Sequence, residues 1–186
     1  MRNSRYKKLN KMFIDRWSPR AFKHSSIALN DIETLFEAAR WSPSCLNEQP
    51  WRFIYADKKD RLEQFQSILV EANKVWAKHA PLLVVVFAKK NYKNNGKPNR
   101  WSEFDTGAAC MALALQANHM GLSCHIMGGF DERKAYEVTA VPPDDYKALC
   151  VMAIGEKGDP DSLPAQLKER EAPSQRIPLT EIANEG

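Results

Sequence analysis

The chain has 186 residues, of which 44% are hydrophobic and 27% are charged, and this composition suits one domain that buries a core without disulfides or metals. Its formal net charge of +4 is modest and its basic residues are scattered, which argues against a nucleic-acid-binding protein. The longest apolar run, residues 80–88, is too short to span a membrane.

The cysteines and the N-terminus bear on the cellular compartment. The four cysteines are far apart and form no CxxC pair, which argues against a disulfide framework and fits a reducing cytosol. The N-terminal stretch is basic but contains no apolar signal core and no small-residue cleavage site. We therefore expect a cytoplasmic protein with neither membrane nor nucleic acid as a partner.

Two amphipathic helices are expected at the start of the chain. Apolar residues at helical spacing predict a helix over residues 4–15. Asn30 followed by Glu33 has the spacing of a capping box and predicts a second helix through Arg40. The apolar face of this second helix would consist of Ile32, Leu35, Phe36 and Ala39.

The middle of the chain predicts two strands separated by a helix. Residues 50–56 form the first expected strand, and residues 60–76 form the helix. Residues 82–88 are a continuous β-branched and apolar run, which is typical of a central strand covered on both faces. Residues 89–100 are polar, with Asn-Asn-Gly and a proline, and predict a loop.

Residues 105–120 are rich in alanine and other small residues. They predict a helix that another backbone can approach closely, either in the core or at a dimer interface, and Gly121 would end this helix.

The last part of the chain predicts two short strands, a short helix and an extended tail. Residues 125–127 form a strand, Asp131 caps the helix, and residues 149–154 form another buried strand. We expect a single domain over 1–186 with an α+β fold, in which helices flank a mixed β-sheet. The tail, about residues 156–186, is proline-rich and would wrap a partner subunit.

Several sequence motifs for catalysis are missing. There is no GxGxxG after a strand, no P-loop, no GxSxG and no HExxH. The four histidines have no metal-ligand spacing, so no metal is expected; they are His24, His79, His119 and His125. A cofactor could supply the reactivity instead, with the protein contributing binding and electrostatics.

Arginines and a hydroxyl follow the first predicted helix. Arg16 and Arg20, with Ser18 between them, could hold a phosphate and a second electron-rich group. The alternative is a helix C-terminus whose cations favour the dipole, followed by a Ser-Pro turn.

Three other segments allow a binding role and a structural one. Residues 41–51 could present polar groups on a rigid loop or merely connect a helix to a strand. Gly128 and Gly129 could let the backbone approach a flat ligand, or could form a tight turn that needs positive φ. Arg176 could bind an anion or be solvated.

Taken in order, these segments resemble the nitroreductase family. The resemblance is carried by RWSPR near the start, by ARWSPSCLNEQPWRF, by the helix DTGAACMALALQANHMGLSCHIMGGF and by the tail AIGEKGDPDSLPAQLKEREAPSQRIPL. The family implies an α+β sandwich and an intertwined homodimer with two FMN sites at its interface.

The resemblance also implies roles for individual residues. Arg16 and Ser18 would bind the FMN phosphate, helped by Arg176, and Arg20 would face the N1/O2 edge of the ring. The partner subunit would supply Pro43, Ser44 and Asn47, and the backbone of Gly128 and Gly129 would reach N5. The remaining expected FMN contacts are Trp17, Cys45 and Met127.

Some residues depart from the family pattern. Trp17 stands where a second basic residue is common, which leaves only its backbone as an expected contact. Cys45 replaces a frequent serine, and His125 occupies a frequent tryptophan position. These departures leave the expected flavin binding unchanged and affect instead what can be inferred about the substrate.

The implied activity is transfer of two electrons from NADH or NADPH through FMN to nitroaromatics, quinones or activated alkenes, by a ping-pong mechanism that requires no acid–base side chain. Two alternatives stay open. One keeps the flavin but changes the chemistry to reductive dehalogenation, flavin destruction or substrate dehydrogenation. The other is a non-enzymatic flavin-binding protein. The sequence leaves open whether residues 89–101 form a substrate lid.

Overall fold

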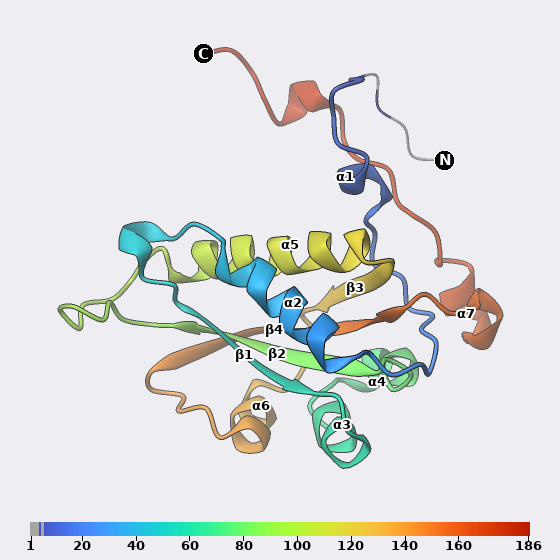
Figure 1. The fold of residues 1–186 in the computed structure, drawn as a ribbon, viewed down its shortest axis with the longest axis horizontal. Helices are drawn as coiled ribbons and strands as arrows, with labels where there is room; N and C mark the ends of the chain where they lie inside the picture. The colour runs from blue at the N-terminus through green and yellow to red at the C-terminus, as the bar shows by residue number, and fades with distance from the viewer. Residues whose placement is uncertain (1–3, 5) are drawn as a thin grey trace.

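Four strands form one sheet in the computed structural model, which describes residues 4 and 6–186 (Figure 1). The order across the sheet is β1-β2-β4-β3. Their bounds are Trp51–Ala56 for β1, Leu82–Lys89 for β2, Leu122–Met127 for β3 and Tyr146–Glu156 for β4. The strands fall where the sequence predicts them, although β3 and β4 are longer than expected.

All three pairs of neighbouring strands are antiparallel. The expected α+β class is confirmed, but the expectation of a mixed sheet is wrong for the described residues. The helix between β2 and β3 makes these two strands run in the same direction, as in a parallel crossover. However, β4 lies between them and pairs with both, so no parallel neighbours arise.

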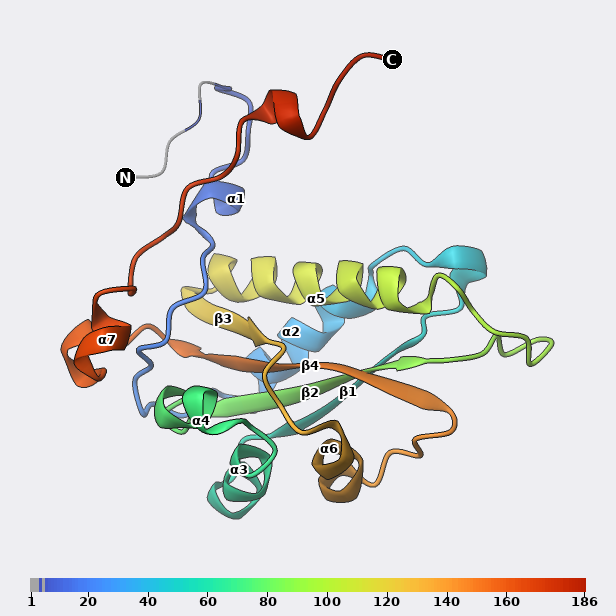
Figure 2. The same cartoon turned by 180° about the vertical axis from the view of Figure 1, so that it is seen from behind.

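Helices cover both faces of the sheet (Figure 2). One face is covered by α2 (Leu29–Arg40) and α5 (Ser102–His119). The opposite face packs against α3 (Lys59–Gln66), α4 (Glu71–Ala77) and α6 (Glu132–Thr139). Successive residues of β2 contribute alternately to the two cores, and this confirms the prediction of a central strand buried on both faces.

The apolar face of α2 is confirmed, but its capping box is wrong. Helix α2 begins at Leu29 after an extended Ala28, and no side chain caps it. Residue Asn30 is already inside the helix, where its carbonyl accepts a 2.7 Å hydrogen bond from the Thr34 hydroxyl. The helix therefore starts too early for Asn30 to be the capping residue.

The single helix predicted over 60–76 is instead two helices, α3 and α4. Residues between them pair with the backbone that follows β3: the amide of Asp131 donates to the carbonyl of Ile68 at 2.8 Å, and Leu69 bridges to Phe130. A continuous helix would have used that carbonyl internally, so the break ties this face to the loop after β3.

Helix α5 contributes most of its small residues to the core. It spans residues 102–119 rather than 105–120 and ends before Gly121, whose φ of 77° favours glycine. Its outward-facing Phe104 and Met111 stay exposed. The prediction that Asp131 caps a helix is confirmed, because its carboxylate accepts from the amide of Lys134 at the start of α6.

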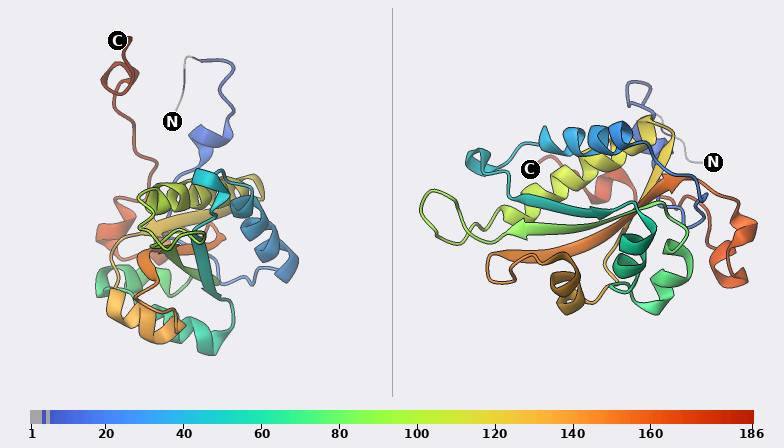
Figure 3. Two further views of the ribbon diagram at one scale, coloured as in Figure 1. Left: turned by 90° about the vertical axis from the view of Figure 1, so that its left-hand side faces the viewer. Right: turned by 60° about the horizontal axis from the view of Figure 1, so that its bottom comes forward.

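The two terminal segments extend away from the sheet side by side (Figure 3). Of the helix predicted over 4–15, in which Arg5 lies outside the described residues, only α1 (Met12–Asp15) forms. Asn10 accepts a hydrogen bond from the amide of Met12 and thereby starts this turn late. The tail contains only short helical turns: η2 (Pro160–Ser162), α7 (Ala165–Lys168) and η3 (Leu179–Glu181).

The short helical turn η1 (Cys45–Asn47) lies on the connection from α2 to β1. Within the described residues, no helix has the length and apolar character needed to cross a membrane. The same part of the chain contains no group of three or more histidine, cysteine or acidic side chains arranged to hold a metal ion.

Candidate functional site

Four arginines line one cavity of about 340 Å³, called the arginine pocket below. The lining residues come from the segment after α1, from β3 and from the tail: Arg16, Trp17, Ser18, Arg20, His125, Arg170, Ala172, Ser174 and Arg176. The structure thus brings together five of the residues expected to contact FMN, Arg16, Trp17, Ser18, Arg20 and Arg176, although Arg176 lies far from the others in the chain.

The charges in the arginine pocket suit an anion. Burial and then the nearby positive charge of Arg176 lower the pKa of the Arg16 guanidinium. The Arg16 Nη1 atom also donates to the Ser18 hydroxyl at 3.5 Å. Guanidinium groups held close to one another repel, and a multiply charged anion such as a phosphate relieves this repulsion while accepting their hydrogen bonds.

The segment that carries Arg16 and Arg20 is held against the end of β4. The amide of Lys23 donates to the carbonyl of Glu156 at 3.0 Å, and the amide of Gly158 donates to the carbonyl of Ala21 at 2.8 Å. A Cβ atom on Gly158 would lie 2.7 Å from the carbonyl carbon of Phe22. Glycine at this position therefore permits the close backbone approach that places the arginines.

His125 forms another wall of the arginine pocket. Its Nδ1 lies 2.9 Å from the carbonyl oxygen of Pro19, and its ring packs 4.5 Å, centroid to centroid, from the ring of Trp76. Because a carbonyl can only accept, the hydrogen must be on Nδ1. Burial is the main cause that lowers the pKa of His125, so the ring is neutral at pH 7 and Nε2 is left as an acceptor.

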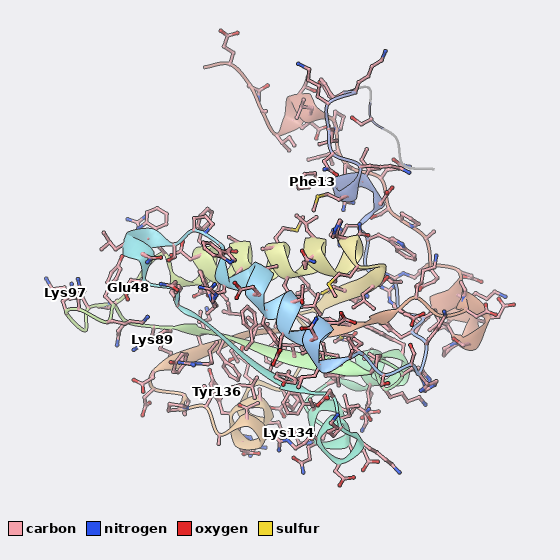
Figure 4. All side chains as sticks on the ribbon, viewed as in Figure 1. Phe13, Glu48, Lys89, Lys97, Lys134 and Tyr136 are labelled. Carbon is pink, nitrogen blue, oxygen red and sulfur yellow. The ribbon has the colours of Figure 1, made fainter. Side chains whose placement is uncertain are left out.

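The expected residues of the 41–51 loop do not line the arginine pocket. The segment with η1, which contains Pro43, Ser44, Cys45 and Asn47, lies near the N-terminus of α5. The segment after α1 and the start of the tail, which line the arginine pocket together with β3, lie toward the C-terminal end of α5 (Figures 1 and 2). With 18 residues, α5 is about 27 Å long. In Figure 4 the labelled Glu48, next to this loop, lies far from the labelled Phe13 in α1, the helix that directly precedes Arg16. One chain therefore presents two separate groups of expected site residues.

This loop has an unusual backbone. Leu46, Asn47 and Gln49 have φ values of 54°, 56° and 49°, in the left-handed region that non-glycine residues rarely adopt. Each such residue costs of order 1–3 kcal/mol and persists only where its surroundings enforce it. Strain of this kind is concentrated at functional sites.

Side chains around the loop enforce this conformation. The amide of Cys45 donates to the buried carboxylate of Asp105 at 3.0 Å, and the amide of Gln49 donates to the Ser44 hydroxyl at 2.9 Å. The carboxylate of Glu48, also buried, accepts from the amide of Lys93 at 2.9 Å. The 89–101 segment is therefore fastened directly to the loop that carries Asn47.

The glycines after β3 differ from each other. Neither has positive φ, so the interpretation as a tight turn that needs positive φ is wrong. A Cβ on Gly129 would lie 2.7 Å from the side-chain Nδ2 of Asn73, whereas a Cβ on the exposed Gly128 would meet nothing within 4 Å. Met127, which precedes them, is buried. The backbone at Gly128 is thus open to a ligand, and Gly129 is packed closely against the side chains of Asn73 and Val70.

A larger cavity of about 670 Å³ lies elsewhere, around His24 and His79. None of the residues expected from the sequence to bind a ligand lines it. We place the candidate site at the smaller arginine pocket, because there the charge and the hydrogen-bond donors match a specific ligand chemistry.

Some residues around the site were not indicated by the sequence. Arg170, Ala172 and Ser174 line the arginine pocket. Glu171 accepts a hydrogen bond from the backbone amide of Arg20, and Asp105 accepts one from the backbone amide of Cys45 in the 41–51 loop. A surface arginine in a polar tail gives no signal of its own, since most such arginines are solvated. Asp105 begins the alanine-rich segment and could have been noticed as an acidic residue in an otherwise small-residue helix.

Comparison with known proteins gives a consistent result. The model of the nitroreductase family matches residues 14–156. The oxygen-insensitive NADPH nitroreductase of Helicobacter acinonychis is 28% identical over 185 residues, covering 81% of this chain and 88% of that protein. The crystal structure of an oxidoreductase containing FMN is 40% identical, covers 100% of this chain and 94% of its own, and superposes with a TM-score of 0.95. A nitroreductase family protein from Streptococcus pneumoniae, at 20% identity and a TM-score of 0.76, covers 95% of this chain and 98% of its own and shares the fold.

Proposed function

The chain belongs to the nitroreductase family, and from this premise we propose that it is an FMN-dependent oxidoreductase that passes two electrons from NADH or NADPH to nitroaromatics, quinones or activated alkenes. The observation that carries the proposal is the arginine pocket, in which Arg16, Arg20 and Arg176 meet a hydroxyl, Ser18, around a cavity. This donor set fits the phosphate of FMN. Gly128 leaves its backbone open for the ring.

In this proposal each residue has a defined task. Arg16, Ser18 and Arg176 bind the phosphate, with Trp17 contributing its backbone. Arg20 places a positive charge at the N1/O2 edge of the ring, where negative charge develops on reduction. When bound, FMN would supply the two-electron chemistry of a ping-pong sequence, in which the electrons come from the nicotinamide and then pass to the acceptor.

We further propose that the protein is a homodimer with its sites at the interface. The two groups of expected site residues lie toward opposite ends of α5, so Pro43, Ser44, Cys45 and Asn47 would complete the pocket of the partner subunit. Apolar side chains exposed on the terminal segments support this arrangement, since Phe13, Ile177 and Ile182 are each at least half exposed in the single chain. The tail would extend from its single domain over the partner.

The test is the visible spectrum of the purified protein, followed by anaerobic addition of NADH and then of NADPH. We expect flavin absorption bands that bleach with at least one of the two reductants. Bands that do not bleach would favour a non-enzymatic flavin-binding protein. A colourless protein that fails to take up added FMN would contradict the proposed function.

A variant tests the role of Arg20. Arg20→Ala is expected to weaken FMN binding or to slow reduction of the flavin by NAD(P)H, because it removes the positive charge at the N1/O2 edge. A variant with the wild-type FMN affinity and the wild-type rate of reduction would contradict this role. Product analysis with and without NAD(P)H in air separates reduction of an added acceptor from other flavin chemistry.

A further inference from the structure

Glu171 has a buried carboxylate in a mostly exposed tail. Its side chain is 1% exposed, while the residues that follow it are exposed. One carboxylate oxygen, Oε1, accepts hydrogen bonds from the amide of Arg20 at 2.7 Å and from the amide of Ala21 at 2.9 Å. Charged side chains are rarely buried unless they are paired. These two hydrogen bonds therefore fasten the tail, at Glu171, to the segment after α1 that carries Arg20.

The second carboxylate oxygen has a different environment. Oε2 is buried and accepts no hydrogen bond within the described part of the chain. It lies 3.9 Å from the Nη1 atom of Arg20, a distance at which charges interact although no hydrogen bond forms. The negative charge of Glu171 is therefore directed at the guanidinium of Arg20.

The position of Glu171 in the chain places its negative charge next to the arginine pocket. Its neighbours Arg170 and Ala172 both line the arginine pocket, together with Arg16, Arg20 and Arg176. One buried negative charge thus stands behind a cavity lined by four positive charges. It offsets part of the positive potential without occupying the space in which an anion would bind.

We propose that Glu171 is a positioning residue with two effects: its Oε1 holds the tail and Arg20 together as walls of the arginine pocket, and its charge lowers the positive potential that Arg20 presents to the flavin. The second effect rests on the proposed function, and the first does not. Nothing in the chain itself reacts at Glu171; it acts through Arg20.

Two substitutions separate these effects. Glu171→Gln keeps an oxygen that can accept from both amides but removes the charge. Glu171→Ala removes the acceptor and leaves two buried amides unsatisfied. Glu169→Gln is the matched control, since Glu169 lies two residues earlier in the same tail, is exposed, and undergoes the same change of charge.

The first measurement is the rate at which trypsin cleaves the full chain without FMN at the bond after Arg176, whose neighbouring residues none of these substitutions changes. Glu171→Ala should be cleaved roughly tenfold faster than wild type, because loss of an acceptor for two buried amides releases the tail. Glu171→Gln and Glu169→Gln should be cleaved at the wild-type rate. Wild-type resistance in Glu171→Ala would overturn the anchoring effect.

The second measurement is the reduction potential of bound FMN. Glu171→Gln should have a more positive potential than wild type, because removal of a negative charge near Arg20 stabilises the additional negative charge of reduced flavin. Glu169→Gln should have the wild-type potential. A merely structural Glu171 would leave the potential of Glu171→Gln unchanged, and that result would overturn the electrostatic effect.

The two measurements also separate this inference from the proposed function. If the wild-type protein took up no FMN, the proposed function and with it the electrostatic effect would be overturned. The trypsin assay would still decide the anchoring effect, since faster cleavage of Glu171→Ala supports it and unchanged cleavage contradicts it.

Discussion

The Nδ1 atom of His125 lies 2.9 Å from the carbonyl oxygen of Pro19, so strand β3 directly holds the segment that carries Arg16 and Arg20. Pro19 is buried and His125 is packed against Trp76. A protonated His125 would add a positive charge beside a cavity already lined by four arginines. The neutral ring, in contrast, can hold the Pro19 carbonyl without adding charge.

This relationship predicts how stability depends on pH. Burial lowers the pKa of His125 below its usual value of 6.5. Below pH 6.5 the unfolded chain therefore binds more protons than the folded chain, and the free energy of unfolding decreases as the pH falls toward the lowered pKa. In His125→Asn this contribution is absent.

Urea denaturation of both proteins between about pH 7.5 and about pH 5.5 checks this expectation, since carboxylates titrate mostly below this range. The difference in the free energy of unfolding, wild type minus His125→Asn, should decrease toward the lower pH. The comparison also removes the contribution of His79, whose pKa is lowered in both proteins. A difference that stays constant would contradict a neutral, buried His125.

Arg16 is expected to contribute to anion binding rather than to folding. Arg16→Ala should weaken FMN binding by roughly tenfold or more, the size of a lost charge-assisted hydrogen bond. Burial and then the neighbouring charge of Arg176 lower the pKa of Arg16, so removing Arg16 also removes a repulsion. The stability of the protein without FMN should therefore decrease by less than about 1 kcal/mol.

Fluorescence titration with FMN and thermal unfolding without FMN measure the two quantities. Arg133→Ala is the control, because it removes the same charge from an exposed position on α6. Equal FMN affinities for Arg16→Ala and Arg133→Ala would show that the arginine pocket does not bind the phosphate.

The two glycines after β3 should respond differently to alanine. Gly129→Ala should destabilise the fold by about 1–3 kcal/mol, as overpacking does, since its Cβ would meet Asn73 and Val70. Gly128→Ala should change the free energy of unfolding by less than about 0.5 kcal/mol, since its Cβ would meet nothing. We expect Gly128→Ala nevertheless to weaken FMN binding, because the added methyl group would occupy the space proposed for the ring.

Denaturant unfolding and FMN titration of both glycine variants provide the check. Gly128→Ala with both wild-type stability and wild-type FMN affinity would remove Gly128 from the proposed site. A Gly129→Ala protein as stable as wild type would show that the side chains of Asn73 and Val70 can move to accept the methyl group.

The left-handed backbone at Leu46 predicts a stabilising substitution. The Leu46 side chain is 75% exposed, so Leu46→Gly loses little packing and relieves a conformation that costs about 1–2 kcal/mol for an L-residue. Glycine also has a larger entropy in the unfolded chain, which offsets part of this gain. The expected net stabilisation is up to about 1 kcal/mol. Leu29→Gly, at an exposed leucine that is the first residue of helix α2, should instead destabilise, by up to about 1 kcal/mol.

In chemical denaturation, Leu46→Gly and Leu29→Gly should therefore change the free energy of unfolding in opposite directions. If the loop conformation contributes to the site, Leu46→Gly should also bind FMN more weakly, since the backbone at Asn47 becomes less restricted. Destabilisation in both variants would show that the 44–49 loop is not strained.

The sequence predicts the local elements of the fold better than their connections. The buried run of β2 and the apolar face of α2 follow directly from hydrophobic patterning, and both are confirmed. The break between α3 and α4 could not be predicted, because it depends on a backbone pairing with Phe130 and Asp131, more than 60 residues away in the chain. The antiparallel sheet depends on β4 entering between β2 and β3, which no local pattern specifies.

In the candidate site, too, the locally encoded part could be predicted from the sequence and the part that depends on long-range contacts could not. Arg16, Ser18 and Arg20 form a dense local motif, which the sequence indicates, and the structure places them around one cavity. Arg170 and Glu171 acquire their positions only because the tail folds back onto the segment after α1. In the sequence they are two charged residues in a charged stretch.

The separation of the site residues along α5 has a consequence for mixtures of defective chains. A chain with Arg16→Ala and a chain with Asn47→Ala would each form dimers in which both proposed sites are damaged. When the two chains exchange subunits, a hybrid dimer would collect both substitutions in one site and leave the other site with neither. Complementation between the two damaged proteins would then restore flavin binding of wild-type affinity at one site, whereas two substitutions within the arginine pocket, at Arg16 and Arg176, would never complement each other.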